Sequence, residues 1–208
     1  MKWRVIPVTH YEQNCSLISC EKSGKGALID PGGEAPRLLQ AAEEEGVEIE
    51  KILLTHGHLD HVGAARQIAR QLGIPILGPH QADAFWLQML PSQAQMFGFP
   101  ELEAFEPDRW LEEGDQIEVG ETTLAVLHCP GHTPGHVVFY SAAERVAFVG
   151  DVLFQGSVGR SDFPRGDHAA LIDSIKNKLL PLGDEVTFVP GHGPNSTFGF
   201  ERQHNPYL

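Results

Sequence analysis

The 208-residue sequence predicts an α/β fold in four layers, an αββα sandwich with two β-sheets packed together and helices outside them. Two observations predict it. Strand-like and helix-like segments follow one another in the order strands, helix, strands, helix. The second half of the chain repeats the order of the first half without repeating its sequence. Because no linker divides the chain, residues 1–208 are expected to form a single domain.

The first half is predicted to open with three short strands, at residues 3–8, 15–20 and 27–29, before a turn at residues 30–33. A helix is expected over residues 34–45, because apolar residues recur along one side of it and Gly46 is suited to end it. A short buried strand at residues 52–54 leads directly into a histidine-rich motif. A helix over residues 61–72 and a strand at residues 74–77 complete this half.

The second half is predicted to begin with an irregular region, residues 80–110, that contains a helix at residues 81–90 and then a loop. Four strands follow, at residues 117–119, 122–128, 137–140 and 146–149, and then a helix at residues 167–179 and a strand at residues 186–189. The irregular region contains Phe85, Trp86, Phe97 and Phe99. They could form a wall over a site, although packing in the core is the favoured interpretation.

Charge and composition exclude several classes of partner. The net charge is −13 and the 15 Lys and Arg residues are scattered, so nucleic acid is not an expected partner. No apolar run approaches the roughly 18–20 residues that span a bilayer, so no membrane partner is expected. The N-terminus lacks the features of a signal peptide, which predicts a cytoplasmic location. Three cysteines without a CxxC pair are expected to be free thiols, and the oligomeric state stays open.

Residues 55–61, Thr-His-Gly-His-Leu-Asp-His, place three imidazoles and a carboxylate within six residues. Three more candidate ligands follow predicted strands or lie beside glycine, where the backbone bends tightly. The candidate metal ligands are His56, His58, Asp60, His61, His132, Asp151 and His192. The competing interpretation is that all seven are helix caps and core polar groups, but buried His and Asp need partners, and no others are evident.

Spacing predicts two metal positions. His56 and His58 are two residues apart on an extended loop, so both can face the same side, where His132 would join them. Asp60 and His61 begin a helix and can face a second point, with His192. Asp151 could bridge the two positions. Imidazole and carboxylate without thiolate suit divalent metals, with zinc favoured and iron or manganese as alternatives.

The remaining histidines are expected to lie on the surface or in loops. These isolated residues are His10, His80, His128, His168 and His204. His136 differs because it is close to a predicted ligand, and it is expected to hydrogen-bond to the ligand shell.

The HxHxDH motif, taken with His132, Asp151 and His192, resembles the metallo-β-lactamase superfamily over essentially the whole chain. Within it, residues 129–136 and 150–154 are similar to glyoxalase II, the hydroxyacylglutathione hydrolases, and residues 201–208 resemble the short bacterial members. The resemblance implies a metallo-β-lactamase fold and a hydrolase of thioesters such as S-lactoylglutathione. A hydroxide bridging two metals would attack the thioester carbonyl. Asp60 would orient that hydroxide as the catalytic residue.

Two departures from glyoxalase II concern the glutathione moiety. The chain lacks the C-terminal helical extension that supplies cations in the longer enzymes. A Lys and a Tyr that hold glutathione in those enzymes correspond here to Arg160 and Asp162. Arg160 could bind a substrate carboxylate, and an ion pair with Asp162 or Asp167 is an equal alternative.

Three alternative functions remain. A persulfide dioxygenase would hold one iron through His56, His132 and Asp151, with open positions for oxygen and persulfide. A lactonase or β-lactamase would share the hydrolytic chemistry. A non-catalytic metal-binding module is disfavoured, because a closed structural zinc site needs only four ligands.

Overall fold

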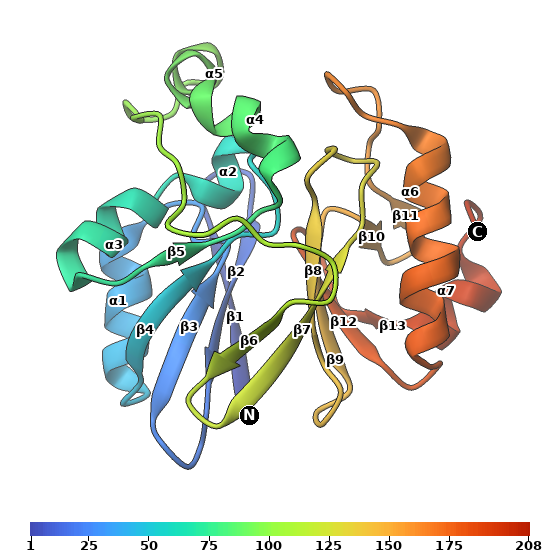
Figure 1. Cartoon of the computed structure of the whole chain (residues 1–208), viewed down its shortest axis with the longest axis horizontal. Helices are drawn as coiled ribbons and strands as arrows, with labels where there is room; N and C mark the ends of the chain where they lie inside the picture. Colours follow the sequence, from blue (N-terminus) through green and yellow to red (C-terminus); the bar gives the residue numbers. More distant parts are fainter.

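Two β-sheets packed together form the centre of the computed structural model, which describes residues 1–208 (Figure 1). The first sheet contains β1 (Lys2–Val8), β2 (Gln13–Ser19), β3 (Lys25–Ile29), β4 (Glu48–Leu53) and β5 (Ile76–Leu77), in that order. The second has the order β13 (Ser196–Thr197), β12 (Thr187–Pro190), β9 (Val146–Gly150), β8 (Val137–Ser141), β7 (Thr122–His128) and β6 (Gln116–Val119). A separate hairpin joins β10 (Leu153–Phe154) to β11 (Ser157–Val158).

Helices cover the outer faces of both sheets, which confirms the predicted αββα layers. The helices α1 (Ala35–Glu44) and α3 (Ala65–Leu72) lie outside the first sheet, and α6 (His168–Ser174) and α7 (Phe198–His204) lie outside the second (Figure 1). The short helix α2 (Leu59–Val62) follows β4. Above it lie α4 (Ala84–Gln88) and α5 (Leu90–Phe97), at one end of the two sheets (Figure 1). No helix is long and apolar enough to cross a membrane.

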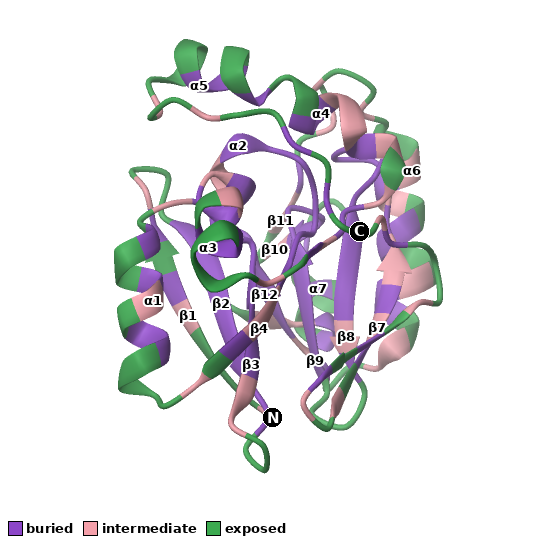
Figure 2. Ribbon diagram, turned by 60° about the vertical axis from the view of Figure 1, so that its left-hand side comes forward, coloured by how far each residue is buried: buried purple, intermediate pink, exposed green.

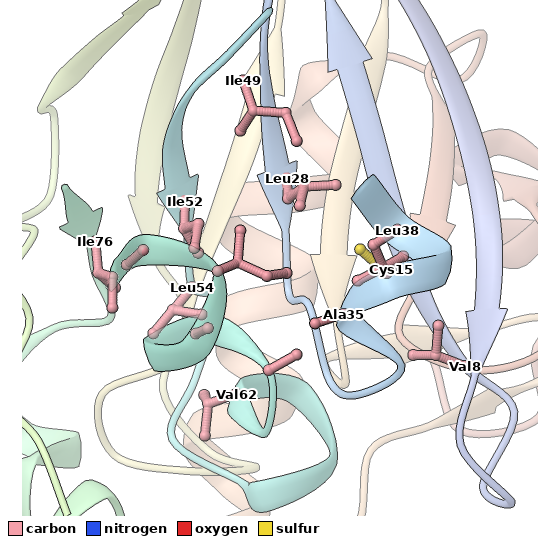
Figure 3. Close-up of a cluster of buried hydrophobic side chains, with 14 of the residues drawn as sticks. Val8, Cys15, Leu28, Ala35, Leu38, Ile49, Ile52, Leu54, Val62 and Ile76 are labelled. Atoms are coloured by element: carbon pink, nitrogen blue, oxygen red, sulfur yellow. The ribbon is translucent and has the colours of Figure 1, made fainter. Parts of the chain in front are cut away.

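Three buried apolar clusters correspond to the three interfaces between the layers. The first lies between the first sheet and its helices, where Leu28 and Ile52 of the strands meet Leu38 of α1 (Figure 3). The second joins the sheets, with Leu53 from the first and Phe139 from the second. The third packs the second sheet against α6 and α7. Figure 2 shows this pattern, with buried strands inside and exposed residues on the outer sides of the helices.

Strand direction places the candidate ligands at one edge. The strands β3 and β4 are parallel, as are β9 and β12, so the segments that follow them emerge at matching ends. The strand β8 is antiparallel to β9, so the loop before β8 reaches the edge where β9 ends. The predicted convergence of the motifs follows from this strand order.

Several predicted boundaries are wrong. The helix expected over residues 61–72 begins earlier, at Leu59, and is split into α2 and α3. At the break, Gly63 packs so closely on Gly32 that a side chain there would collide with the Gly32 carbonyl. The predicted loop after residue 90 contains α5, which ends at Gly98 in the left-handed conformation. The short strands β10, β11 and β13, each of two residues, and the helix α7 were not expected. The three cysteines are free, as predicted, and all three are buried.

We expect Phe139→Ala to lower the free energy of unfolding by about 3–5 kcal/mol, because the ring is fully buried between the sheets and its removal leaves a cavity. Urea unfolding of the metal-free protein measures this. Phe200→Ala, at an exposed phenylalanine of α7, is the control and should change stability by less than about 1 kcal/mol. Equal effects of the two substitutions would contradict the assignment of Phe139 to the core between the sheets.

Candidate metal centre

The loop between β4 and α2 carries the first candidate ligands, and a buried carboxylate fixes its path. Asp30 accepts hydrogen bonds from the Thr55 amide (2.7 Å) and the Thr55 hydroxyl (2.6 Å). His58 lies at the N-cap of α2 with an extended backbone. His58 thus has the extended backbone that the sequence predicts, and the hydrogen bonds to Asp30 hold the loop at Thr55.

Three imidazoles form the first group. The Nδ1 atom of His58 lies 3.1 Å from Nε2 of His56 and 3.0 Å from Nε2 of His132. Burial lowers the pKa of His58 to about 3, and burial lowers the pKa values of His56 and His132 as well. Neutral rings keep a free lone pair, so three ring nitrogens at such distances are suited to share one cation.

Asp60, His61 and His192 form the second group. Asp60 Oδ2 lies 3.2 Å from Nε2 of His192 and 3.8 Å from Nε2 of His61. Burial acts to raise the pKa of Asp60, but His61 and His192 hold it below its usual value, so the carboxylate is ionised.

Asp151 lies between the two groups. Its Oδ1 is 3.4 Å from Nε2 of His61, and its Oδ2 is 3.6 Å from Nε2 of His132. Gly191 allows this close approach, since a side chain there would collide with Asp151 Oδ1. The structure thus brings together all seven residues that the sequence singled out.

The donor atoms fit a cation. His61 Nε2 and Asp151 Oδ1 are buried and have no hydrogen-bond partner within the protein. Buried polar atoms without a partner are rare because they lose their hydration without replacement. A metal ion between these atoms would satisfy both, which makes the donor set consistent with a binuclear centre.

The other nitrogen of most of these rings contacts an oxygen outside the cluster. Nδ1 of His61 lies 2.9 Å from Asp30 Oδ2, and Nδ1 of His132 lies 2.7 Å from the Arg160 carbonyl oxygen. Nδ1 of His192 lies 3.1 Å from the carbonyl oxygen of Tyr11. A ring that donates from Nδ1 presents its Nε2 lone pair to the cluster, so these contacts orient the rings for metal binding.

The comparisons with known proteins agree with this geometry. The sequence model of the metallo-beta-lactamase superfamily matches residues 8–192. Hydroxyacylglutathione hydrolase GloC of Haemophilus influenzae is 51% identical over 209 residues, which cover 100% of this chain and 98% of that protein. The chain belongs to the metallo-β-lactamase superfamily. The probable metallo-hydrolase YqgX of Bacillus subtilis is 36% identical, over 100% of this chain and 98% of that protein.

Solved structures show the same superfamily fold. The BLEG-1 B3 metallo-beta-lactamase superposes with a TM-score of 0.92 at 37% identity, covering 100% of this chain and 99% of that chain. TTHA1623 in a di-iron-bound form has a TM-score of 0.89 at 38% identity, covering 99% and 100% of the two chains. The predicted metallo-β-lactamase fold and the predicted resemblance to hydroxyacylglutathione hydrolases are both confirmed.

His136 lies beside the two ligand groups but belongs to neither. Its Nε2 accepts a hydrogen bond from the Asp151 amide at 3.1 Å, and burial holds its pKa well below the usual value. The prediction that His136 hydrogen-bonds beside the ligands is confirmed. The five isolated histidines take no part in the ligand groups, and two of them, His80 and His128, stack on each other with ring centroids 4.3 Å apart.

Asp83 is a residue of the site that the sequence reasoning missed. Its fully buried carboxylate accepts hydrogen bonds from the Gly57 amide (2.9 Å), the Thr133 hydroxyl (2.8 Å) and the Gly135 amide (2.6 Å). Burial raises its pKa to about 6, against the lowering effect of these donors. Asp83 therefore ties together the two loops that carry the three-histidine group. Nothing in its sequence neighbourhood marks it, because its partners lie far along the chain.

A cleft of about 880 Å³ opens onto the two groups. Trp86 and Phe97 line it, as the alternative interpretation of a wall predicts, and the favoured interpretation of core packing is wrong for the exposed Phe97. Phe85 lies outside the cleft under the guanidinium of Arg165, and Phe99 stacks on Tyr11 with ring centroids 5.5 Å apart.

Arg160 also lines the cleft, and its guanidinium forms an ion pair with a neighbouring carboxylate. Its Nε and Nη2 atoms donate to the two carboxylate oxygens of Asp162, at 3.0 and 2.9 Å, and both side chains are exposed. The guanidinium lies 4.5 Å from the centroid of the Phe163 ring. Of the two acidic partners expected for Arg160, Asp162 is the one that pairs with it. Asp167 instead accepts a hydrogen bond from the Ala170 amide and caps α6.

We expect Asp83→Asn to weaken metal binding about 10- to 100-fold, because an amide presents one acceptor oxygen in place of two, and both ligand loops lose support. Competition with a chelator, followed by counting of the retained metal, measures the loss. Asp108→Asn is the matched control, since Asp108 also accepts from a backbone amide, that of Ile76, but away from the site. Chelator resistance equal to that of the parent protein would contradict the role given to Asp83.

Proposed function

We propose that this protein is a metal-dependent hydrolase of thioesters of the hydroxyacyl-glutathione type, with S-lactoylglutathione as the first candidate substrate. One observation supports it most strongly: two groups of ligands share Asp151 at the base of an open cleft. The curated relative GloC is named for this reaction. We also infer that residues 1–208 form one domain, which is supported by the apolar cluster that joins both sheets.

The proposed metal ligands are seven residues, the six of the two groups together with Asp151. Zinc is the favoured metal for imidazole and carboxylate donors without thiolate, and the di-iron form of TTHA1623 supports iron as an alternative. When bound, two such ions supply a hydroxide nucleophile at neutral pH and positive charge that stabilises a developing oxyanion.

Asp60 is the proposed catalytic residue. Its carboxylate lines the cleft, is ionised, and is held by His192 on one side. It can accept a hydrogen bond from the attacking water and so fix the direction of attack. No side chain is required as a general acid, because a thiol of ordinary pKa leaves as a stable thiolate. Arg160 is proposed to contact a substrate carboxylate, with its charge shared between substrate and Asp162.

The alternative reaction, persulfide oxidation at a single iron, would need only His56, His132 and Asp151. The convergence of Asp60, His61 and His192 on a second point exceeds that need and supports hydrolysis. The structure of ETHE1 from Myxococcus xanthus resembles this chain less closely, with a TM-score of 0.81 at 25% identity.

The first test is hydrolysis of S-lactoylglutathione by the metal-loaded protein, followed through the ultraviolet absorbance of the thioester. We expect turnover that falls to background after chelation and returns when zinc, iron or manganese is added back. Absence of turnover in protein shown to hold two metals would overturn the proposal. Oxygen uptake with glutathione persulfide would instead assign the protein to the dioxygenases.

We expect Asp60→Asn to lower kcat by about 10²-fold or more, since the amide cannot accept a proton or orient water as a carboxylate does. The thermal midpoint of the variant should stay close to that of the parent, because Asp60 is partly exposed to the cleft. Metal counting accompanies the assay, with Asp108→Asn as the control. Near-normal kcat in Asp60→Asn with both metals bound would remove Asp60 from the proposed catalytic role.

A further inference from the structure

We propose that Glu201 is a positioning residue that holds the hairpin β10–β11 in place as one side of the cleft. Glu201 lies on α7, within residues 201–208, the C-terminal segment that resembles the short bacterial glyoxalase II enzymes. The role rests on the proposed thioester hydrolysis for its kinetic test, and it gives this segment a part in shaping the cleft for substrate.

The hairpin β10–β11 forms part of the cleft wall. Four of its residues line the cleft: Phe154, Gln155, Ser157 and Val158. Each of its strands is two residues long, and the strands pair only with each other, as a sheet separate from the two large ones. An isolated two-stranded hairpin has little stability of its own in water. Its place in the cleft wall must therefore come from contacts with the rest of the fold.

The open end of the hairpin is fixed at the candidate metal centre. The first strand begins shortly after Asp151. Beyond the second strand, the Gly159 amide donates to the Val152 carbonyl oxygen at 3.2 Å. The carbonyl oxygen of Arg160 then lies 2.7 Å from Nδ1 of His132. These contacts hold the open end without any contribution from α7.

The turn of the hairpin is held by two polar side chains of the C-terminal segment. Glu201 Oε2 accepts a hydrogen bond from the Gly156 amide at 2.8 Å. Asn205 Nδ2 donates to the Ser157 carbonyl oxygen at 3.0 Å and to Glu201 Oε2 at 2.9 Å, which links the two contacts. Glu201 is fully buried, and its Oε1 accepts from the Ser196 hydroxyl at 2.5 Å. Because both carboxylate oxygens accept hydrogen bonds, the side chain is fixed and can hold the turn.

Helix α7 is attached to the second sheet by other residues. Phe198 is fully buried and stacks on Phe188 of β12, with ring centroids 5.5 Å apart. Arg202 donates to Asp184 Oδ1 at 2.9 Å and to the Leu180 carbonyl oxygen at 2.7 Å. Loss of the buried carboxylate should therefore release the turn of the hairpin while α7 stays in place.

The kinetic test is Glu201→Ala in the metal-loaded protein, with S-lactoylglutathione as substrate. We expect KM to rise about fivefold or more, because a mobile hairpin must be ordered again when substrate binds. The value of kcat should change by less than about twofold and both metals should be retained, because the open end of the hairpin stays fixed. This split separates positioning from a general loss of folded protein, which would lower the apparent kcat and leave KM unchanged.

Two further variants of α7 serve as controls. Glu201→Gln keeps an oxygen that can accept from the Gly156 amide and from Asn205. Its amide group can donate to the Ser196 hydroxyl, so KM should lie within about twofold of the parent value. Arg202→Ala removes two hydrogen bonds of α7 that do not involve the hairpin, so stability should fall without a rise in KM. An equal rise in KM in Arg202→Ala would assign the effect to the packing of α7 and overturn the role of Glu201.

Hydrogen exchange of the metal-loaded protein gives a readout that needs no substrate. The amides of residues 153–158 should exchange about tenfold faster in Glu201→Ala than in the parent protein or in Arg202→Ala, because the hairpin opens more often. Asn205→Ala removes the second contact to the turn and should raise both the exchange rate and KM. It tests the same role if Glu201→Ala does not fold.

Failure of this role and failure of the proposed function give different results. An unchanged KM in Glu201→Ala would overturn the positioning role, whether or not the hairpin exchanges faster. Loss of metal, or a fall in kcat with KM unchanged, would place the effect of Glu201 at the ligand loops and would overturn it as well. Absence of turnover in parent protein that holds two metals would overturn the proposed function, and the exchange rates would still decide whether Glu201 orders the hairpin.

Discussion

The position of the Asp151 carboxylate between two sets of imidazoles is the constraint on which the rest of this structure depends. One oxygen faces His61 and the other faces His132, so a single side chain lies next to both ligand groups. Asp151 follows directly after β9, and its amide is fixed by His136. The strand order of the second sheet, with β12 parallel and β8 antiparallel to β9, then brings the segments of His192 and His132 to the same point.

Buried carboxylates hold the loops of the site from outside the ligand shell. Asp30 fixes Thr55 and the ring of His61, and Asp83 joins the loop of Gly57 to that of Thr133 and Gly135. Each of these carboxylates is out of water and accepts several hydrogen bonds, which offsets the loss of hydration. The rings of the candidate ligands are therefore held by hydrogen bonds from outside the ligand shell.

The candidate ligands and the opposite wall of the cleft come from different parts of the fold. The His and Asp groups come from loops at the ends of buried strands, which the two sheets hold rigidly. The helices α4 and α5, which bring Trp86 and Phe97 to the cleft, lie outside both sheets and carry several exposed side chains. Changes in such a segment can alter the lining of the cleft without disturbing the candidate ligands. This separation explains how one ligand set can occur in enzymes with different substrates.

The sequence by itself determined which seven side chains gather at the site and the order of the layers. The seven residues were predictable because the HxHxDH spacing is local, and because His132, Asp151 and His192 each adjoin a glycine or a recognisable strand. The sandwich was predictable because strand and helix patterns depend on neighbouring residues. The tertiary structure alone decided the role of Asp83, whose three partners lie 26, 50 and 52 residues away. It also decided the break at Gly63, the choice of Asp162 over Asp167 as the partner of Arg160, and the helix α5 in place of a predicted loop. For Asp83 and Gly63 the deciding contacts join segments that are distant in the chain, and local periodicity carries no information about such contacts.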